Sequence, residues 1–181
     1  MKKTTRETIG AFIIISVAYI ASYTLVAGFI APLQELILPT FTTSISLLFL
    51  PHGIRILAAY YYGWKALPLL LPSMYLMWFI TVYANNISLH PLSPLFSGIA
   101  CIIAVKFIFK NIKHIIEKEW KLLLLAGLVG SFLNGLSHSF LVYKSFLTIS
   151  FIGYTIGDIL GQILLMLMFI YILKFIKLFK N

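Results

Sequence analysis

The sequence predicts an all-α fold, a polytopic bundle of about six transmembrane helices that makes residues 1–181 a single membrane domain. Hydrophobic residues make up 61% of the chain and charged residues only 10%, so it cannot form the polar surface that a soluble domain presents to water. Apolar runs recur along the whole length, and each crossing of about 30 Å of hydrocarbon takes roughly 20 residues. Six crossings leave no room for a soluble domain.

The first expected span is Ile9–Ile30, which follows Lys2, Lys3 and Arg6. A basic start followed by an apolar run is also the pattern of a signal peptide. This run is longer than the apolar region of a signal peptide, however, and no small-residue cleavage site follows it. We therefore expect a span that is retained in the mature protein.

Glycine, proline and charged residues divide the rest of the sequence into further apolar runs. The expected spans are Leu36–Trp64, Ala66–Tyr83, Leu92–Phe109, Trp120–Val142 and Leu147–Leu173. The first of these is irregular, because Pro51 removes a backbone donor and Gly53 relaxes the backbone dihedrals. Either the span is broken or kinked at Pro51–Gly53 within the membrane, or these residues turn near the cytoplasmic face and the next helix runs on from Ile54.

The net charge of +9 comes from basic groups beside the ends of the apolar runs, where cytoplasmic loops of membrane proteins collect them. The groups are Lys2, Lys3 and Arg6, then Lys65, the segment Lys106–Lys121, and the tail with Lys174, Lys177 and Lys180. They all fall on one side of the membrane when both termini are cytoplasmic, and Lys144 is the exception. Topology thus accounts for the charge, and we expect no nucleic-acid partner.

Two charged residues, Arg55 and Asp158, lie away from the ends of the spans, where charge is costly in lipid. Each lowers the cost of the other if they pair, and further polar side chains could add hydrogen bonds in the same interior. These side chains are His52, Asn134, His138 and Gln162. The group is either a site for a polar ligand or a proton, or a structural ion pair. In the broken-helix layout, backbone groups freed at Pro51–Gly53 would also face the site, which would then bind a polar or anionic group.

Glycine recurs at every fourth position of the last span, at Gly153, Gly157 and Gly161. Small residues on one face let two helix backbones approach closely in lipid. The fifth span has a similar stripe that includes Gly130, and a short connection joins the two spans. We therefore expect an antiparallel hairpin that packs through the faces carrying Gly130 and Gly157.

The sequence contains no nucleophile triad pattern, CxxC pair, HExxH motif or phosphate-binding glycine loop. It therefore predicts neither an enzyme nor a metal site. His52 and His138 could ligate a haem between helices, since imidazole is the usual axial ligand, but two histidines without further spacing do not define such a site. The cofactor is left unassigned.

Two stretches resemble the membrane-associated sensor domains of the MASE type found in bacterial signalling proteins. The first is Leu48–Ala59, which is similar to the proline-x-glycine turn and small-residue helix of that family, together with an aliphatic-glycine end at Tyr62-Gly63-Trp64. The second is Gly157-Asp158-Ile159-Leu160-Gly161, which resembles the family's Gly-Asp-x-x-Gly near the start of its final span. The order of the stretches agrees as well, and the match covers about half of the chain.

The resemblance implies a module of the bacterial inner (plasma) membrane that senses a ligand or passes a signal to a separate partner. The chain departs from the family at His52, where the family tends to place a second proline or a small residue, and it is shorter. It also ends at Asn181 without a kinase or nucleotide-cyclase output domain. Signal transduction would then require another protein.

Two other interpretations fit a compact chain of about six helices without a catalytic domain. One is the substrate-binding component of a small-molecule importer, for a vitamin or another metabolite. The other is a non-catalytic subunit of a larger membrane complex, with its glycine face buried against another chain. The expected partners are therefore the lipid bilayer, a membrane protein or a second copy of the chain, and a small polar ligand.

Overall fold

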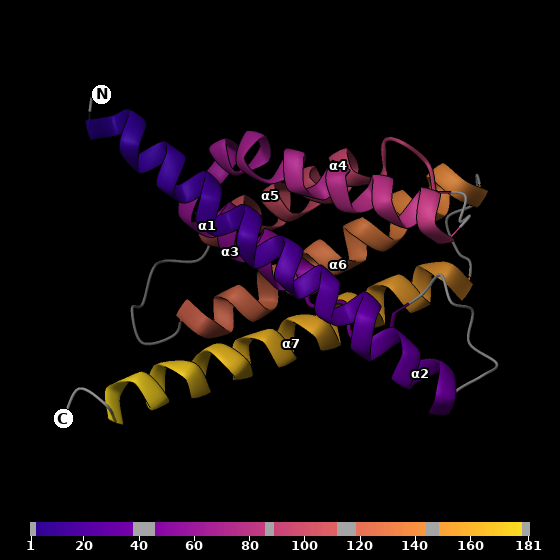
Figure 1. The fold of residues 1–181 in the computed structure, drawn as a ribbon. Helices are drawn as coiled ribbons and strands as arrows, with labels where there is room; N and C mark the ends of the chain where they lie inside the picture. Colours follow the sequence, from indigo (N-terminus) through magenta and orange to yellow (C-terminus); the bar gives the residue numbers. More distant parts are fainter. Residues whose placement is uncertain (1–2, 38–45, 86–88, 112–118, 144–148, 179–181) are drawn as a thin grey trace.

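The computed structural model describes residues 3–37, 46–85, 89–111, 119–143 and 149–178, and within these ranges all regular structure is helical (Figure 1). The elements are α1 (Lys3–Leu25), the π-helical turn η1 (Val26–Ile30), α2 (Ala31–Ile37), α3 (Pro51–Tyr62), the 3₁₀ turn η2 (Gly63–Lys65), α4 (Ala66–Asn85), α5 (Ser93–Asn111), α6 (Glu119–Tyr143) and α7 (Ile149–Leu178). The predicted all-α fold is thus confirmed for the described residues.

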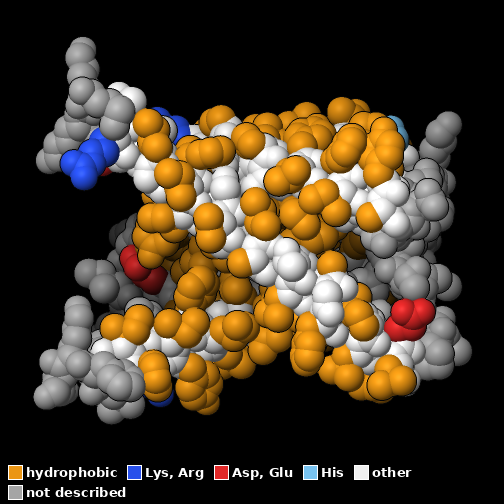
Figure 2. Space-filling model, viewed as in Figure 1, with side chains coloured by type: hydrophobic (Ala, Val, Ile, Leu, Met, Phe, Trp, Pro, Cys, Tyr) orange, Lys and Arg blue, Asp and Glu red, His pale blue; other side chains and the backbone are white. Residues whose placement is uncertain are grey.

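Five helical stretches of the described residues are long and apolar enough to cross a membrane. They are Thr5–Ile37, Pro51–Ala84, Ser93–Lys110, Glu119–Leu141 and Phe151–Ile176. Hydrophobic side chains cover much of the face of the molecule shown in Figure 2. Many large hydrophobic side chains are exposed, such as Ile14 at 70% and Phe29 at 65%. An apolar surface of this extent is suited to lipid and is compatible with a multi-pass membrane protein.

Helix α1 begins and α7 ends at the same end of the bundle, which we call the basic end (Figure 1). The start of α1, η2, the end of α5, the start of α6 and the end of α7 lie at this end (Figure 1), and each carries exposed basic side chains. They include Arg6, Lys65, Lys110, Lys121 and Lys174. Within the segment Lys106–Lys121, residues 112–118 lie outside the described residues, as does Lys144.

Helix α3 lies at the centre of the bundle and contacts α1, α4, α5, α6 and α7. Its residues Pro51 to Ile56 are all buried, including the charged Arg55. This first part of α3 is surrounded by protein rather than by lipid, whereas Tyr61 and Tyr62 at its end are exposed. Helix α3 can therefore carry polar side chains that a lipid-facing helix could not.

Pro51 begins α3, and residues 51–53 form its first turn. Proline suits this position, because its missing N–H would have no partner in the first turn. The N–H groups of His52 and Gly53 donate to the carbonyls of Phe49 and Leu50, at 3.2 and 3.1 Å. The expectation that Pro51–Gly53 would offer free backbone groups to a ligand was therefore wrong for these two amides. Of the expected span Leu36–Trp64, residues 38–45 lie outside the described residues, and residues 46–50 are not helical.

The non-helical residues 46–50 rest on the glycine stripe of α7. The N–H of Phe49 donates to the carbonyl of Gly157, at 2.9 Å. A Cβ atom added to Gly157 would collide with the carbonyl oxygen of Ser46, and one added to Gly161 would collide with the backbone of Phe49. These two glycines therefore admit another part of the backbone at van der Waals distance, as small residues do in membrane helices.

Helices α6 and α7 pack against each other, but not through the expected faces. Gly130 of α6 faces Ile56 of α3 and Ala104 of α5. The face of α7 that carries Gly157 lies instead against the non-helical segment that contains Ser46. The close contacts between α6 and α7 lie instead at Gly127, beside the Gln162 side chain, and at Gly135, beside Thr155 and Phe151. Gly153, the third glycine of the stripe, is buried in α7.

Replacing Gly161 by alanine should destabilise the fold by about 1–3 kcal/mol, because the added methyl group must displace the backbone of Phe49. Gly10→Ala in α1 is the matched control, since nothing lies within 4 Å of its added Cβ. Thermal unfolding of both variants in detergent measures the difference. Equal unfolding temperatures would show that residues 46–50 do not rest on α7.

Candidate functional site

Polar side chains from three helices meet in the interior of the bundle. His52 and Arg55 are three positions apart on α3 and so lie on one face of that helix, and Asn134 and His138 are four positions apart on one face of α6. Asp158 enters from α7, one residue after the glycine that contacts Phe49. The packing of α3 between α6 and α7 brings these groups together.

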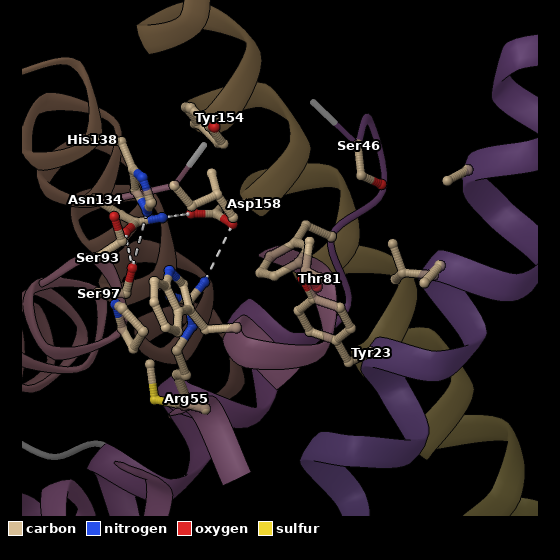
Figure 3. Close-up of a pocket in the computed structure, with 18 of the residues that line it drawn as sticks. Tyr23, Ser46, Arg55, Thr81, Ser93, Ser97, Asn134, His138, Tyr154 and Asp158 are labelled. Carbon is tan, nitrogen blue, oxygen red and sulfur yellow. Dashed lines mark hydrogen bonds and ion pairs between the residues drawn. The ribbon is translucent and has the colours of Figure 1, made fainter. Parts of the chain in front are cut away.

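The Asp158 cluster consists of Asp158, Arg55, His52 and Asn134, each of them at most 2% exposed. Nη2 of Arg55 donates to Oδ1 of Asp158 at 3.4 Å, and Nδ2 of Asn134 donates to Oδ2 at 2.5 Å (Figure 3). Nδ1 of His52 lies 3.2 Å from the same Oδ2. The expected pairing of Arg55 with Asp158 is therefore present, and both carboxylate oxygens have partners.

Both ring nitrogens of His52 contact polar groups of the protein. Nε2 lies 3.2 Å from the carbonyl oxygen of Gly127 and 3.1 Å from Oγ of Ser131. Oγ of Ser131 also donates to the carbonyl oxygen of Gly127, at 2.8 Å. Nδ1 faces Asp158, with Nη2 of Arg55 at 3.4 Å and the Cys101 sulfur at 3.9 Å.

A second chain of hydrogen bonds joins the Asp158 cluster to His138. Oγ of Ser97 donates to Oδ1 of Asn134 at 2.6 Å, and Nε2 of His138 lies 3.2 Å from the same Oγ (Figure 3). Because the hydroxyl hydrogen of Ser97 is engaged, Nε2 of His138 is the donor, and Nδ1 of the neutral ring is an acceptor. The His138 ring stacks on Tyr154 with a centroid distance of 4.6 Å.

A cavity of about 500 Å³ adjoins the Asp158 cluster (Figure 3). One part of the cavity is lined by Arg55, Asp158, Asn134 and His138. Another part is lined by Tyr23 of α1 and Thr81 of α4, and the Tyr23 hydroxyl donates to Oγ1 of Thr81 at 2.8 Å. The volume falls within the range of small-molecule pockets, roughly 300–1,000 Å³. The wall also contains apolar side chains, among them Val26, Phe49 and Met74.

The cavity occupies the half of the bundle that lies away from the basic end. It is lined by the end of α1, by η1 and α2, by the start of α5 and by the later part of α6. Pro32 and Glu35 of α2 line it and are exposed, so the cavity reaches the surface beside α2. Val26 and Ala27 belong to the π-helical turn η1, and such turns are frequent at functional sites.

Four buried polar atoms of the cavity lining have no hydrogen-bond partner within the described part of the chain. They are Nε of Arg55, Nε1 of Trp78, Oγ of Ser93 and Nδ1 of His138. Buried polar atoms are nearly always hydrogen-bonded, to protein, water or a ligand. Their concentration in one cavity indicates a place where a small molecule or water completes the hydrogen bonds.

The residues proposed from the sequence have different positions relative to this cavity. Arg55, Asn134, His138 and Asp158 line it, and His52 contacts Asp158 without lining it. Gln162 does not reach it, because Gly127 leaves a space between α6 and α7 that the Gln162 side chain fills. Its Nε2 donates instead to the carbonyl of Leu123, at 2.8 Å. Gln162, a ligand-binding candidate from the sequence, is therefore not part of the lining of this cavity.

Haem ligation by His52 does not fit the arrangement of its ring, because both nitrogens face protein groups. Across the described ranges, no group of three or more His, Cys, Asp and Glu side chains is placed to hold a metal ion.

Several residues that line the cavity were not predicted from the sequence. Ser93 and Ser97 are four positions apart, as are Tyr19 and Tyr23, and this spacing marks one face of a helix. Polar residues that repeat along one face of an apolar span were a usable signal. Trp78 gave no such signal, because a tryptophan near the end of a span is usually an interfacial anchor.

Comparisons of the chain with protein-family models, with curated proteins and with solved structures found no match. The resemblance to MASE-type sensor domains is therefore carried by the two stretches Leu48–Ala59 and Gly157–Gly161 alone.

Asp158→Asn should destabilise the fold more than Arg55→Gln. The first change leaves the buried Arg55 charge without its carboxylate, whereas the second leaves Asp158 with His52 and Asn134 as partners. Removing one member of a buried pair costs about 3–5 kcal/mol, and the double variant should recover part of the loss of Asp158→Asn. Thermal unfolding of all three variants tests this, and additive losses would rule out coupling between the two residues.

Proposed function

We propose that the chain crosses the membrane six times, with both termini in the cytoplasm. Five crossings would put the start of α1 and the end of α7 on opposite faces, yet both lie at the basic end (Figure 1). The stretch Pro51–Ala84 contains Gly63, which has a φ of 54° and ends α3. We assign two crossings to residues 46–84, one before Gly63 and one after it. The basic end faces the cytoplasm, because cytoplasmic loops collect Lys and Arg.

The second crossing would consist of residues 46–50 followed by α3. Helix α3 has 12 residues and spans roughly 18 Å, too little for about 30 Å of hydrocarbon. Five non-helical residues add at most about 17 Å, which makes up the difference. Non-helical backbone at this depth is tolerated where protein buries it, and α7 supplies that cover through Gly157 and Gly161.

The protein functions in this proposal as a membrane-embedded binding module for a small polar molecule, with the cavity open to the non-cytoplasmic side. The observation that carries the proposal is the group of unpartnered buried atoms on Arg55, Trp78, Ser93 and His138. A structural ion pair alone would need no cavity and would leave no such atoms. The placement of the cavity mouth beside α2, away from the basic end, supports entry from outside the cell.

The assigned role is that of a sensor in the bacterial inner membrane, which passes ligand occupancy to a separate protein. The resemblance of Leu48–Ala59 and Gly157–Gly161 to MASE-type domains supports it. Arg55 and Asp158, which pair beside the cavity, belong to these two stretches. The substrate-binding component of an importer is the alternative, since it needs the same kind of cavity. The identity of the partner separates the two roles.

Native mass spectrometry of the gently extracted protein tests the binding function. We expect the wild type and Arg6→Gln, an exposed control, to retain a small molecule that Arg55→Gln loses. A co-purified kinase or cyclase would favour the sensor, and an ATPase would favour the importer. No retained molecule, together with no thermal stabilisation by a bacterial metabolite extract, would contradict the binding function.

Cysteine accessibility in intact cells tests the topology. A cysteine at Leu36, which is 80% exposed at the end of α2, should react with a membrane-impermeant reagent from outside. A cysteine at the exposed Lys65 should react only after the cells are opened. Cys101 is fully buried and can stay in place. The reverse pattern would overturn the proposed orientation.

A further inference from the structure

The cavity is long and follows the first apolar stretch of the chain. Its lining residues on α1, η1 and α2 extend from Tyr19 to Glu35, a distance of roughly 24 Å at 1.5 Å per residue. All of them belong to the stretch Thr5–Ile37, which is long enough to cross a membrane. A volume of about 500 Å³ distributed over this length makes the cavity narrow. Such a shape suits an extended chain better than a compact metabolite.

Helix contacts leave η1 and α2 apart from most of the bundle. Among the described helices, α2 contacts only η1, and η1 contacts only α1 and α2, whereas α1 packs on α3 and α4. The N–H of Leu47 donates to Oε1 of Gln34 at 2.8 Å and so joins α2 to the segment 46–50. Towards α4, from which α2 diverges in Figure 1, no contact between described helices closes the cavity wall.

The cavity therefore opens towards the hydrocarbon as well as at the end of the bundle. Ala27 and Pro32 line it and are exposed, so it reaches the outer surface at both positions. Ala27 is roughly 15 Å of helix away from Ile37, the end of the apolar stretch. In the proposed membrane orientation this depth lies within the hydrocarbon layer, which is about 30 Å thick. A molecule dissolved in the bilayer can enter by this route.

The charged groups of the described lining are balanced. They are Arg55, Asp158 and Glu35. Arg55 and Asp158 pair at 3.4 Å in the interior, and Glu35 is exposed on α2 (Figure 3). A ligand with a net charge would be buried without a counter-ion of its own, which is costly inside a membrane protein. The interior of the cavity therefore favours an uncharged molecule.

Two unpartnered donors mark the polar end of the cavity. Nε of Arg55 and Nε1 of Trp78 are buried and can only donate, so they require an acceptor such as a carbonyl, ether or hydroxyl oxygen. Arg55 belongs to the Asp158 cluster, and Trp78 lies about one turn nearer the basic end than Thr81, the partner of Tyr23. Both donors are thus at the deep end. The wall between them and the mouth is largely apolar and includes Val26, Ala31, Pro32, Met74 and Leu89.

We propose that the ligand is an uncharged, lipid-soluble amphiphile whose oxygen-bearing head binds Arg55 and Trp78 and whose chain lies along η1 and α2. This inference rests on the proposed binding function and names the class of molecule, because the polar group that the cavity binds is then the head of an otherwise apolar ligand. Entry is from the outer leaflet, since the cavity lies away from the basic end.

The test uses a two-phase solvent extract of bacterial cells, with the organic phase separated on an aminopropyl column into neutral lipids, free fatty acids and phospholipids. The neutral lipids should thermally stabilise the full-length wild-type protein in detergent. Stabilisation by the fatty acids or the phospholipids alone would refute an uncharged ligand. Stabilisation by the aqueous phase alone would refute the amphiphile while leaving the binding function intact. No stabilisation by any fraction would refute the binding function itself.

Variants then separate binding in the cavity from a general effect of lipid on the protein. Trp78→Phe leaves the Asp158 cluster intact and removes one donor, so half-maximal stabilisation should require about ten times more of the neutral fraction. Arg55→Lys keeps a positive charge beside Asp158 but lacks Nε, and should have an effect of similar size. Trp64→Phe and Arg6→Lys, at exposed positions, are the matched controls. Equal responses of the wild type, Trp78→Phe and Trp64→Phe would overturn the proposal, whether or not Arg55→Lys folds.

Discussion

The carboxylate of Asp158 must be balanced in the interior of an apolar bundle, and this constraint explains the arrangement of four helices around it. Arg55 and His52 come from α3 and Asn134 from α6, while Ser97 of α5 holds Asn134 in place. The start of α3 also lies near Asp158, so the positive end of the helix dipole adds to the balance. A short helix that begins deep in the bundle can supply all of these groups, whereas a straight span would begin at the membrane surface.

The glycines of α7 make that deep start possible. Gly157 and Gly161 are one helical turn apart on either side of Asp158, and the backbone of residues 46–49 lies against both of them. Any side chain there would push the segment away and move Arg55 out of reach of Asp158. The stripe is therefore a seat for a non-helical segment and not a helix-to-helix contact. It also means that Leu48–Ala59 and Gly157–Gly161, the two stretches that resemble MASE-type domains, touch each other and form one structural unit.

The all-α fold and most helix boundaries could be predicted from the sequence, because apolar length and charged or proline-glycine interruptions are local properties. Helix α4 begins at Ala66, as expected, and α5 and α6 begin within one residue of the expected positions. The pairing of Arg55 with Asp158 was predictable from the cost of isolated charge. The segment that packs on the Gly157 face was not predictable, because a stripe of small residues can accept any of several backbones. The position of Gln162 depended on the space at Gly127, which only the packing of α6 against α7 creates.

An ion pair that serves only to hold helices together would have matched charges and satisfied hydrogen bonds, since an unmatched charge or an unpartnered polar atom reduces its stabilising effect. The Asp158 cluster departs from this in its hydrogen bonds. His52 adds a third polar side chain to a pair that Arg55 and Asp158 could have formed alone. Nε of Arg55 is left without a partner beside the cavity. The unpartnered donor of Arg55 is thus the part of the ion pair that remains available to a molecule entering the cavity.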